Sequence, residues 1–187
     1  MRELEANEGG IALDDAARSR ILHERARKLA AVPSGEAEAG AERIDAVVFS
    51  RNGVRYGAEL AMLREIHVCR EIAWVPSTPA SCLGVINLRG EILPIFDVPL
   101  LLAGGGESVV TPQRILVIES EGRRIGLAAD EIEDSISMTK DELQPPLATF
   151  ANSRAELVRG IARGEVEILD SRKLLLSESL GVDRHHA

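Results

Sequence analysis

The chain has 187 residues, of which 45% are hydrophobic and 28% are charged, and its formal net charge is −8. This composition excludes wholesale disorder, and the negative charge disfavours nucleic acid and anionic lipid as partners. No apolar run reaches the roughly 18 to 20 residues that a membrane helix needs, and the acidic start does not resemble a secretory signal, so we expect a cytoplasmic protein without direct membrane insertion.

Residues 1–41 are predicted to form an N-terminal extension. Within it, apolar residues recur at steps of three and four over about 13–31, which indicates an amphipathic helix. Acidic residues lie in the first turn of this helix and basic residues in its last turn, an order that suits the helix dipole. The stretch 33–40 is predicted to be a linker. We expect the helix either to support self-association or to be a tethered, partly ordered tail.

From about residue 42 the pattern changes to short β-branched runs separated by turn signals such as Asn52-Gly53 and Arg89-Gly90. The first series of strands is predicted at 46–50, 54–58, 66–75 with a break around Arg70, 85–88 and 91–97, with a short helical turn at 60–63. The second series is predicted at 113–119, 123–129, 131–137, 157–162 and 165–169, with a long connection at 139–150.

Two successive sets of five short strands, each too small to bury much surface alone, predict a mainly β fold of two small barrels packed together. A C-terminal helix is expected to be capped by Ser171 and to be stopped by Gly181. The predicted boundaries are 42–181 for the domain, about 44–100 and about 113–170 for its two subdomains, about 171–180 for the helix, and 182–187 for a tail.

The most specific motif is the segment 84–97, which reads Gly-Val-Ile-Asn-Leu-Arg-Gly-Glu-Ile-Leu-Pro-Ile-Phe-Asp. Three further segments accompany it: Trp74-Val75-Pro76, the stretch from Val54 to Ile66, and Ile125-Gly126-Leu127 with Asp130. Together they resemble the CheW family, adaptors that couple chemoreceptors to the histidine kinase CheA. The resemblance runs from about Ile44 to Leu180. It implies two five-stranded SH3-like β-barrels with a groove between them, and a short helix after the motif.

Arg89, at the turn of this motif, is predicted to point outward, either as a solvated side chain or as a guanidinium that reaches a carboxylate or carbonyl of a partner. The resemblance places Glu65 beside the receptor-binding face. It also places apolar or small residues around the groove, where they would hold a receptor helix, with core packing as the alternative for each. These residues are Leu60, Leu63, Ile115, Ile125 and Gly126. We expect Gly126→Arg to disrupt binding more than folding.

No arrangement of residues in the sequence predicts a catalytic group, a cofactor or a metal site. Cys69 and Cys82 match neither a zinc knuckle nor a redox motif, and we expect two reduced structural thiols. The triple glycine at 104–106 lacks the ending of a phosphate-binding loop. The acidic residues between Asp130 and Asp134 are expected to form a solvated strand edge.

The resemblance therefore implies a non-enzymatic adaptor in the cytoplasm, recruited to membrane-associated receptor arrays. Its expected partners are the cytoplasmic hairpin tip of a chemoreceptor and the CheW-like regulatory domain of CheA. One alternative is a CheW-like scaffold of a non-motility pathway that controls pili or surface sensing. Another is a small β-barrel that binds a ligand or nucleic acid, but such a protein needs surface aromatics and a basic groove, whereas this chain has one Trp, one Tyr and three Phe.

Overall fold

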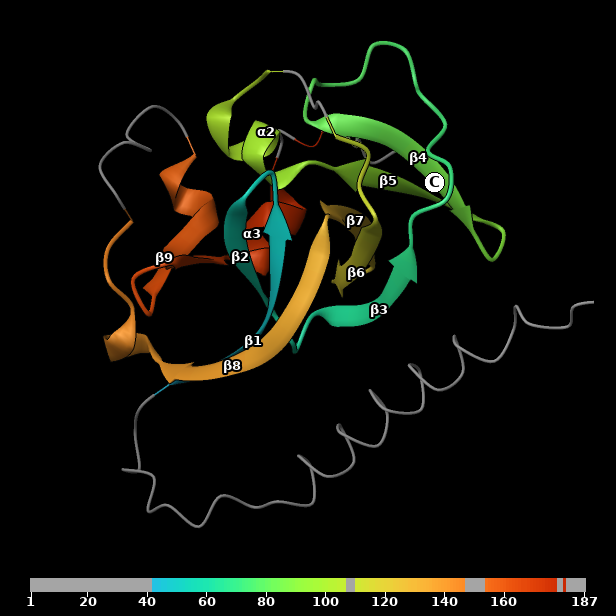
Figure 1. The fold of residues 1–187 in the computed structure, drawn as a ribbon. Helices are drawn as coiled ribbons and strands as arrows, with labels where there is room; N and C mark the ends of the chain where they lie inside the picture. Colours follow the sequence, from blue (N-terminus) through green and yellow to red (C-terminus); the bar gives the residue numbers. More distant parts are fainter. Residues whose placement is uncertain (1–41, 107–109, 147–153, 178–179, 181–187) are drawn as a thin grey trace, which may run out of the picture. The chain divides into compact units, whose positions relative to one another are not determined.

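The structure is a computed structural model that describes residues 42–106, 110–146, 154–177 and 180 (Figure 1). The predicted helix at 13–31, its linker and the predicted tail at 182–187 lie outside the described residues. Among the described residues, no helix is long and apolar enough to cross a membrane.

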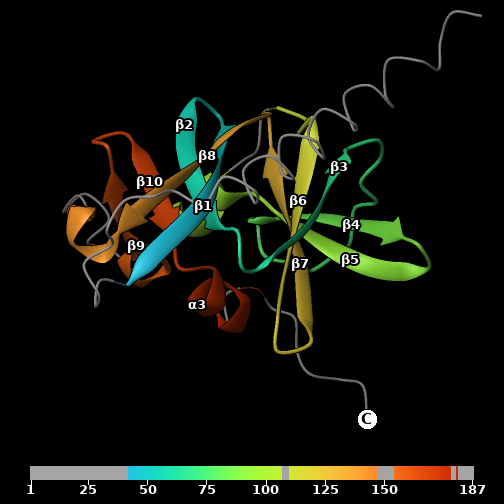
Figure 2. The ribbon, with the colours of Figure 1, turned by 90° about the horizontal axis from the view of Figure 1, so that it is seen from below.

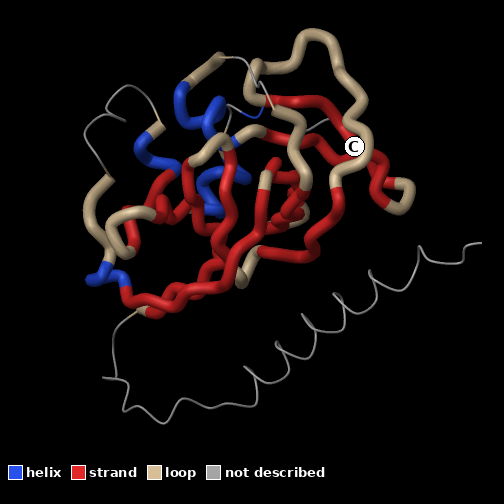
Figure 3. The backbone as a smooth tube through the Cα atoms, in the orientation of Figure 1, coloured by secondary structure: helices blue, strands red, loops and turns tan. Residues whose placement is uncertain are grey.

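Strands dominate this part of the chain, and the helices are short (Figure 3). The strands are β1 (Arg43–Arg51), β2 (Val54–Glu59), β3 (Leu63–Val68), β4 (Cys82–Leu88), β5 (Glu91–Phe96), β6 (Arg114–Ser120), β7 (Arg123–Ala129), β8 (Glu131–Thr139), β9 (Val158–Ala162) and β10 (Val166–Leu169). The helices are α2 (Val98–Ala103), α3 (Ser171–Leu176) and the 3₁₀ turns η1 (Lys140–Glu142) and η3 (Ala155–Leu157).

The strands form two five-stranded sheets, as the sequence predicts, but the sheets are not sequential subdomains. The first sheet has the order β8-β1-β2-β10-β9, and the second has the order β3-β6-β7-β5-β4 (Figure 2). The predicted division into strands of 44–100 and strands of 113–170 is therefore wrong. The chain leaves the first sheet after β2, builds the whole second sheet, and returns at β8.

The reason for this error is that turn signals report only neighbouring strands. The parallel pairs β2–β10 and β5–β7 and the antiparallel pair β1–β8 join segments that are distant in sequence. No local pattern specifies these pairs, because they depend on which strand faces are buried together.

The two turn signals named above are confirmed, and they belong to a set of four two-residue hairpin turns in the described part of the chain with positive φ at both residues. They are Asn52-Gly53, Arg89-Gly90, Glu121-Gly122 and Arg163-Gly164, with φ from 50° to 92°. This conformation at both central residues is the tight turn that matches the twist of a β-hairpin. It fixes Arg89, with φ 54°, at the tip of the β4–β5 hairpin.

Three hydrophobic cores hold the sheets. A central core lies between them and takes Phe49 and Tyr56 from the first sheet, Phe96 and Leu127 from the second, and Leu101 from α2. A second core belongs to the opposite face of the first sheet and a third to the opposite face of the second sheet. Each sheet therefore buries both faces, which explains why aliphatic runs rather than strict alternation mark strands such as β1 and β6.

Two local predictions need correction. Helix α3 is capped by Asp170, whose side chain accepts a hydrogen bond from the Lys173 backbone at 3.0 Å, and it ends at Leu176. Ser171 is instead the first helical residue, and its buried hydroxyl accepts a hydrogen bond from the Glu59 backbone at 3.3 Å. The strand predicted at 66–75 is β3, which begins at Leu63 and ends at Val68. The helical turn predicted at 60–63 therefore cannot include Leu63, which belongs to β3.

Candidate docking site

The structure brings together the two charged residues that the sequence singles out. Glu65 lies on β3 and Arg89 lies at the β4–β5 turn, and Arg89 Nη2 is 2.9 Å from Glu65 Oε2. The Arg89 side chain is 73% exposed, whereas that of Glu65 is 20% exposed. Because β3 and β4 are the opposite edges of the second sheet, the sheet must curl for these side chains to meet.

Further charged residues surround this pair. Arg124 of β7 places Nη2 at 3.3 Å from Glu65 Oε1 and Nε at 3.4 Å from Glu119 of β6, and it also contacts Glu91 of β5. His67 Nε2 lies 2.8 Å from Glu65 Oε2. We call this group the Glu65 cluster: Glu65, His67, Arg89, Glu91, Glu119 and Arg124.

Strand register explains why these residues share one face. Val117 pairs with both Glu65 and Gly126, and Glu119 pairs with Arg124, so every second residue of β3, β6 and β7 points to the same side. The apolar members of that face fill the second sheet's own core. The Glu65 cluster therefore forms the charged end of an otherwise apolar face.

The cluster changes the acidity of Glu65. Partial burial works to raise the pKa of this carboxyl, but the hydrogen bond and charge of His67 and the charges of Arg89 and Arg124 outweigh it, so the pKa lies below its usual value of 4.5. Glu65 is therefore ionised at neutral pH and available as an acceptor for several donors.

The aliphatic candidates do not line an open groove in this structure. Leu63 and Ile125 belong to the central core and Ile115 to the second sheet's core, with exposed fractions of 8%, 3% and 1%. A Cβ on Gly126 would lie 2.5 Å from Ile95 Cδ1 and 2.7 Å from Ile115 Cγ2. Leu60 is only partly buried, against the central core. Core packing, the alternative considered for these positions, describes four of the five.

The expectation for Gly126→Arg must therefore be revised. A side chain at this position meets packed aliphatic atoms, so the substitution is expected to disrupt folding at least as much as binding. Binding roles for the aliphatic candidates stay predictions.

Other apolar side chains are exposed instead. The most exposed among the described residues are Ile66, Val68, Trp74, Ile92, Val110, Val54 and Leu176. Ile66 and Val68 alternate with Glu65 and His67 along β3, and Ile92 follows Glu91 on β5. The alternation of β3 was visible in the sequence, but nothing there indicated which of its faces is covered.

Sequence reasoning also missed a buried charge network. Arg51, at the end of β1, donates from Nε and Nη2 to Asp97 Oδ2 at 2.9 and 2.7 Å, and from Nη1 to Asp130. The side chains of Arg51 and Asp97 are fully buried. Asp130, expected on a solvated edge, instead contacts Arg51 and accepts a hydrogen bond from the Asn52 backbone at 2.8 Å. The network joins the two sheets near α2.

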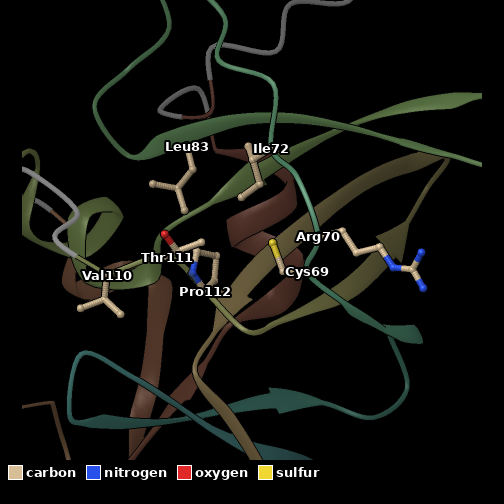
Figure 4. Close-up of a pocket in the computed structure, with 7 residues that line it drawn as sticks. All are labelled: Cys69, Arg70, Ile72, Leu83, Val110, Thr111 and Pro112. Atoms are coloured by element: carbon tan, nitrogen blue, oxygen red, sulfur yellow. The ribbon is translucent and has the colours of Figure 1, made fainter. Parts of the chain in front are cut away.

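An open hollow of about 280 Å³ lies beside this network (Figure 4). Its lining is Cys69, Arg70, Ile72, Leu83, Val110, Thr111 and Pro112. Cys69 is a free thiol, and burial raises its pKa although the charge of Arg51 opposes this. The walls are mainly apolar and lack the converging polar groups that mark a small-molecule site. No group of residues suited to a metal ion occurs in the described part of the chain.

Comparison with known proteins gives a consistent result. A family model described as a CheW-like domain matches residues 45–179. The chemotaxis protein CheW of Klebsiella aerogenes is 28% identical over 139 residues, which cover 73% of this chain and 84% of that protein. The probable chemotaxis protein CheW of Rhizobium etli is 29% identical and covers 71% of this chain and 82% of that protein. The scaffolding protein TtCheW from Thermoanaerobacter tengcongensis superposes with a TM-score of 0.57 at 27% identity, covering 69% of this chain and 90% of that one.

Proposed function

The chain belongs to the CheW family, and from this we propose that it is a non-enzymatic adaptor that couples chemoreceptors to the histidine kinase CheA in a chemosensory array. The curated relatives are chemotaxis proteins, and the similar solved structure is described as a scaffolding protein.

The observation that carries this proposal is the position of Arg89. It lies at the tip of a hairpin, is largely exposed, and is paired with a carboxylate of its own chain. A guanidinium in this state can exchange Glu65 for a carboxylate of a partner at little net cost, because one ion pair replaces another.

We propose that this surface contacts the cytoplasmic hairpin tip of a chemoreceptor, and that a second surface contacts the regulatory domain of CheA. Each contact alone is modest, since exposed ion pairs contribute roughly 0–1 kcal/mol. Linking several modest contacts in an array raises the effective concentration of each partner, so that the assembly is stable although its single contacts are weak. The adaptor in this scheme transmits a rearrangement and changes no covalent bond.

The test is a pull-down of a cognate receptor fragment with the full chain and CheA. We expect wild type to bridge the two partners and Arg89→Glu to lose the bridge, because a carboxylate at this position repels the partner's acidic group and Glu65. Arg163→Glu is the matched control: Arg163 has the same positive-φ turn position and is exposed, but lies on a hairpin of the other sheet. The proposal fails if wild type does not bridge, or if Arg89→Glu and Arg163→Glu bridge equally well.

A further inference from the structure

Glu65 has more than one cationic partner, and its two oxygens are used differently. Oε2 contacts Arg89 at 2.9 Å and His67 at 2.8 Å, while Oε1 contacts Arg124 at 3.3 Å. Because Arg89 and Arg124 approach different oxygens, either can leave without displacing the other.

The two arginines are held very differently. Arg124 extends from β7, an interior strand of the sheet, is 29% exposed, and contacts three carboxylates, those of Glu65, Glu91 and Glu119. Arg89 extends from a turn, is 73% exposed, and has one ion pair within the described part of the chain, the one with Glu65. Arg124 is thus fixed on several sides, and Arg89 is tethered at one point.

We propose that Arg124 is a positioning residue that keeps the Glu65 carboxylate neutralised when Arg89 leaves it for an acidic side chain of a partner. This inference deepens the proposed adaptor function and rests on it. Glu65 is only 20% exposed, so its charge would be poorly solvated if Arg89 were its sole partner. With Arg124 in place the carboxylate keeps a permanent cation, and releasing Arg89 costs less.

His67 differs in kind from the arginines as a partner of Glu65. An imidazole neutralises a carboxylate only when it is protonated, whereas a guanidinium is always charged. The charged groups around Glu65 are Arg64, Arg89, Glu91, Glu119 and Arg124, besides His67. Among the arginines, Arg64 contacts Glu119 and not Glu65, which leaves Arg124 as the permanent cation that stays with Glu65.

The partner group follows from the exchange. Arg89 leaves a carboxylate and therefore gains most from another carboxylate, which can accept two parallel hydrogen bonds from its planar head. The structure therefore favours an acidic residue on the partner at the point where Arg89 makes contact. Removing Arg124 should tie Arg89 more firmly to Glu65 and so weaken binding, although Arg124 does not touch the partner in this scheme.

Two measurements on the full chain test the inference. In the free protein, NMR of arginine side chains should show slower motion of Arg89 in Arg124→Met than in wild type. The second measurement is the affinity of the full chain for the receptor fragment and CheA used in the pull-down. Arg124→Met should weaken this affinity by about fivefold, which corresponds to about 1 kcal/mol of binding free energy. Arg124→Lys should keep most of the affinity that Arg124→Met loses, because lysine keeps the positive charge.

Arg123→Met serves as the matched control, because Arg123 is the neighbouring arginine of β7 and donates to the Leu175 carbonyl at 3.1 Å rather than to Glu65. It should leave both readouts unchanged. In an Arg89→Ala background, Arg124→Met should cause no further loss of binding.

Unchanged Arg89 motion in Arg124→Met overturns the inference, whether or not a partner binds. So does an equal loss of binding in the Arg89→Ala background, because Arg124 would then act by another route. If wild type binds neither partner, the adaptor proposal fails, and the NMR measurement still decides the role of Arg124.

Discussion

Two of the arginine–carboxylate networks in the described part of the chain look alike in composition and differ in burial. Arg51 lies with Asp97 and Asp130 at the junction of the two sheets, where the side chains of Arg51 and Asp97 are fully buried. Arg89 lies with Glu65 at the tip of a hairpin and is 73% exposed. The same pair of chemical groups is therefore inaccessible to a partner in one place and accessible to one in the other.

Burial distinguishes the two networks because it sets the free-energy cost of a charged group that has lost its ion-pair partner. A buried carboxylate without its cation loses solvation that nothing replaces, whereas an exposed guanidinium without its partner is hydrated by water. The first network is expected to resist rearrangement, whereas the proposed function requires the second to exchange partners. Mutations that remove one member of each network measure this difference.

The largest effect is expected from Arg51→Ala. It leaves the fully buried Asp97 without its cation, and breaking a buried pair typically costs about 3–5 kcal/mol. Urea unfolding followed by circular dichroism measures the loss. The double variant Arg51→Met with Asp97→Leu should be more stable than Arg51→Ala, because it leaves no buried charge in that pair. If the single and double variants are equally unstable, the network is not what joins the sheets.

A smaller loss of stability is expected from Gly126→Ala, which tests whether the face that carries the Glu65 cluster is tightly packed at this position. Its Cβ would approach Ile95 Cδ1 to 2.5 Å, and overpacking of this kind costs about 1–3 kcal/mol. The measurement is again urea unfolding. Gly53→Ala is the contrasting variant, since Gly53 has φ +77° and no atom within 4 Å of an added Cβ, so its loss of stability reports backbone strain without overpacking. A Gly126→Ala variant as stable as wild type would show that this face is open, as the groove interpretation requires.

Particular elements show which features of the fold could be predicted from the sequence. Turn signals at Asn52-Gly53 and Arg89-Gly90 predicted hairpins correctly, because a tight turn depends on its own two residues. The partition into sheets was wrong because the pairing of β2 with β10 is specified by packing over more than 100 residues of chain. The number of strands depends on local sequence, whereas their order in a sheet depends on contacts between distant segments of the chain.

The predictions for the candidate docking site show the same difference between local and long-range features. Arg89 was predicted to be exposed because a side chain at a tight turn points outward, and the structure agrees. For Ile115 and Ile125 the sequence left groove lining and core packing open, and the two could not be separated until both faces of the second sheet were known to be covered. Arg51 was overlooked because an arginine beside a turn is usually exposed, and its acidic partners lie 46 and 79 residues further along the chain.

A third variant, Glu65→Gln, probes the exposed network through pH. The folded pKa of Glu65 lies below its usual 4.5, so ionised Glu65 stabilises the fold above that value, and this contribution disappears as the pH falls through the lower folded pKa. We expect Glu65→Gln to cost about 1 kcal/mol at pH 7 and nothing in acid. Unfolding of both proteins from pH 7 to pH 3 measures this. A constant difference across the range would mean that Glu65 acts by packing and not by charge.

The smallest effect on stability, and the sharpest contrast with Arg51, is expected from Arg89→Ala. An exposed arginine with a single ion pair contributes little to folding, so the free energy of unfolding should change by less than about 0.5 kcal/mol. Glu65 keeps Arg124 in this variant, which further limits the loss. Urea unfolding in low and in high salt is the measurement, and raising the salt concentration should shrink the small difference because exposed pairs are screened. A loss close to that of Arg51→Ala would place Arg89 among the residues that hold the fold and would remove the reason to regard it as free to bind another chain.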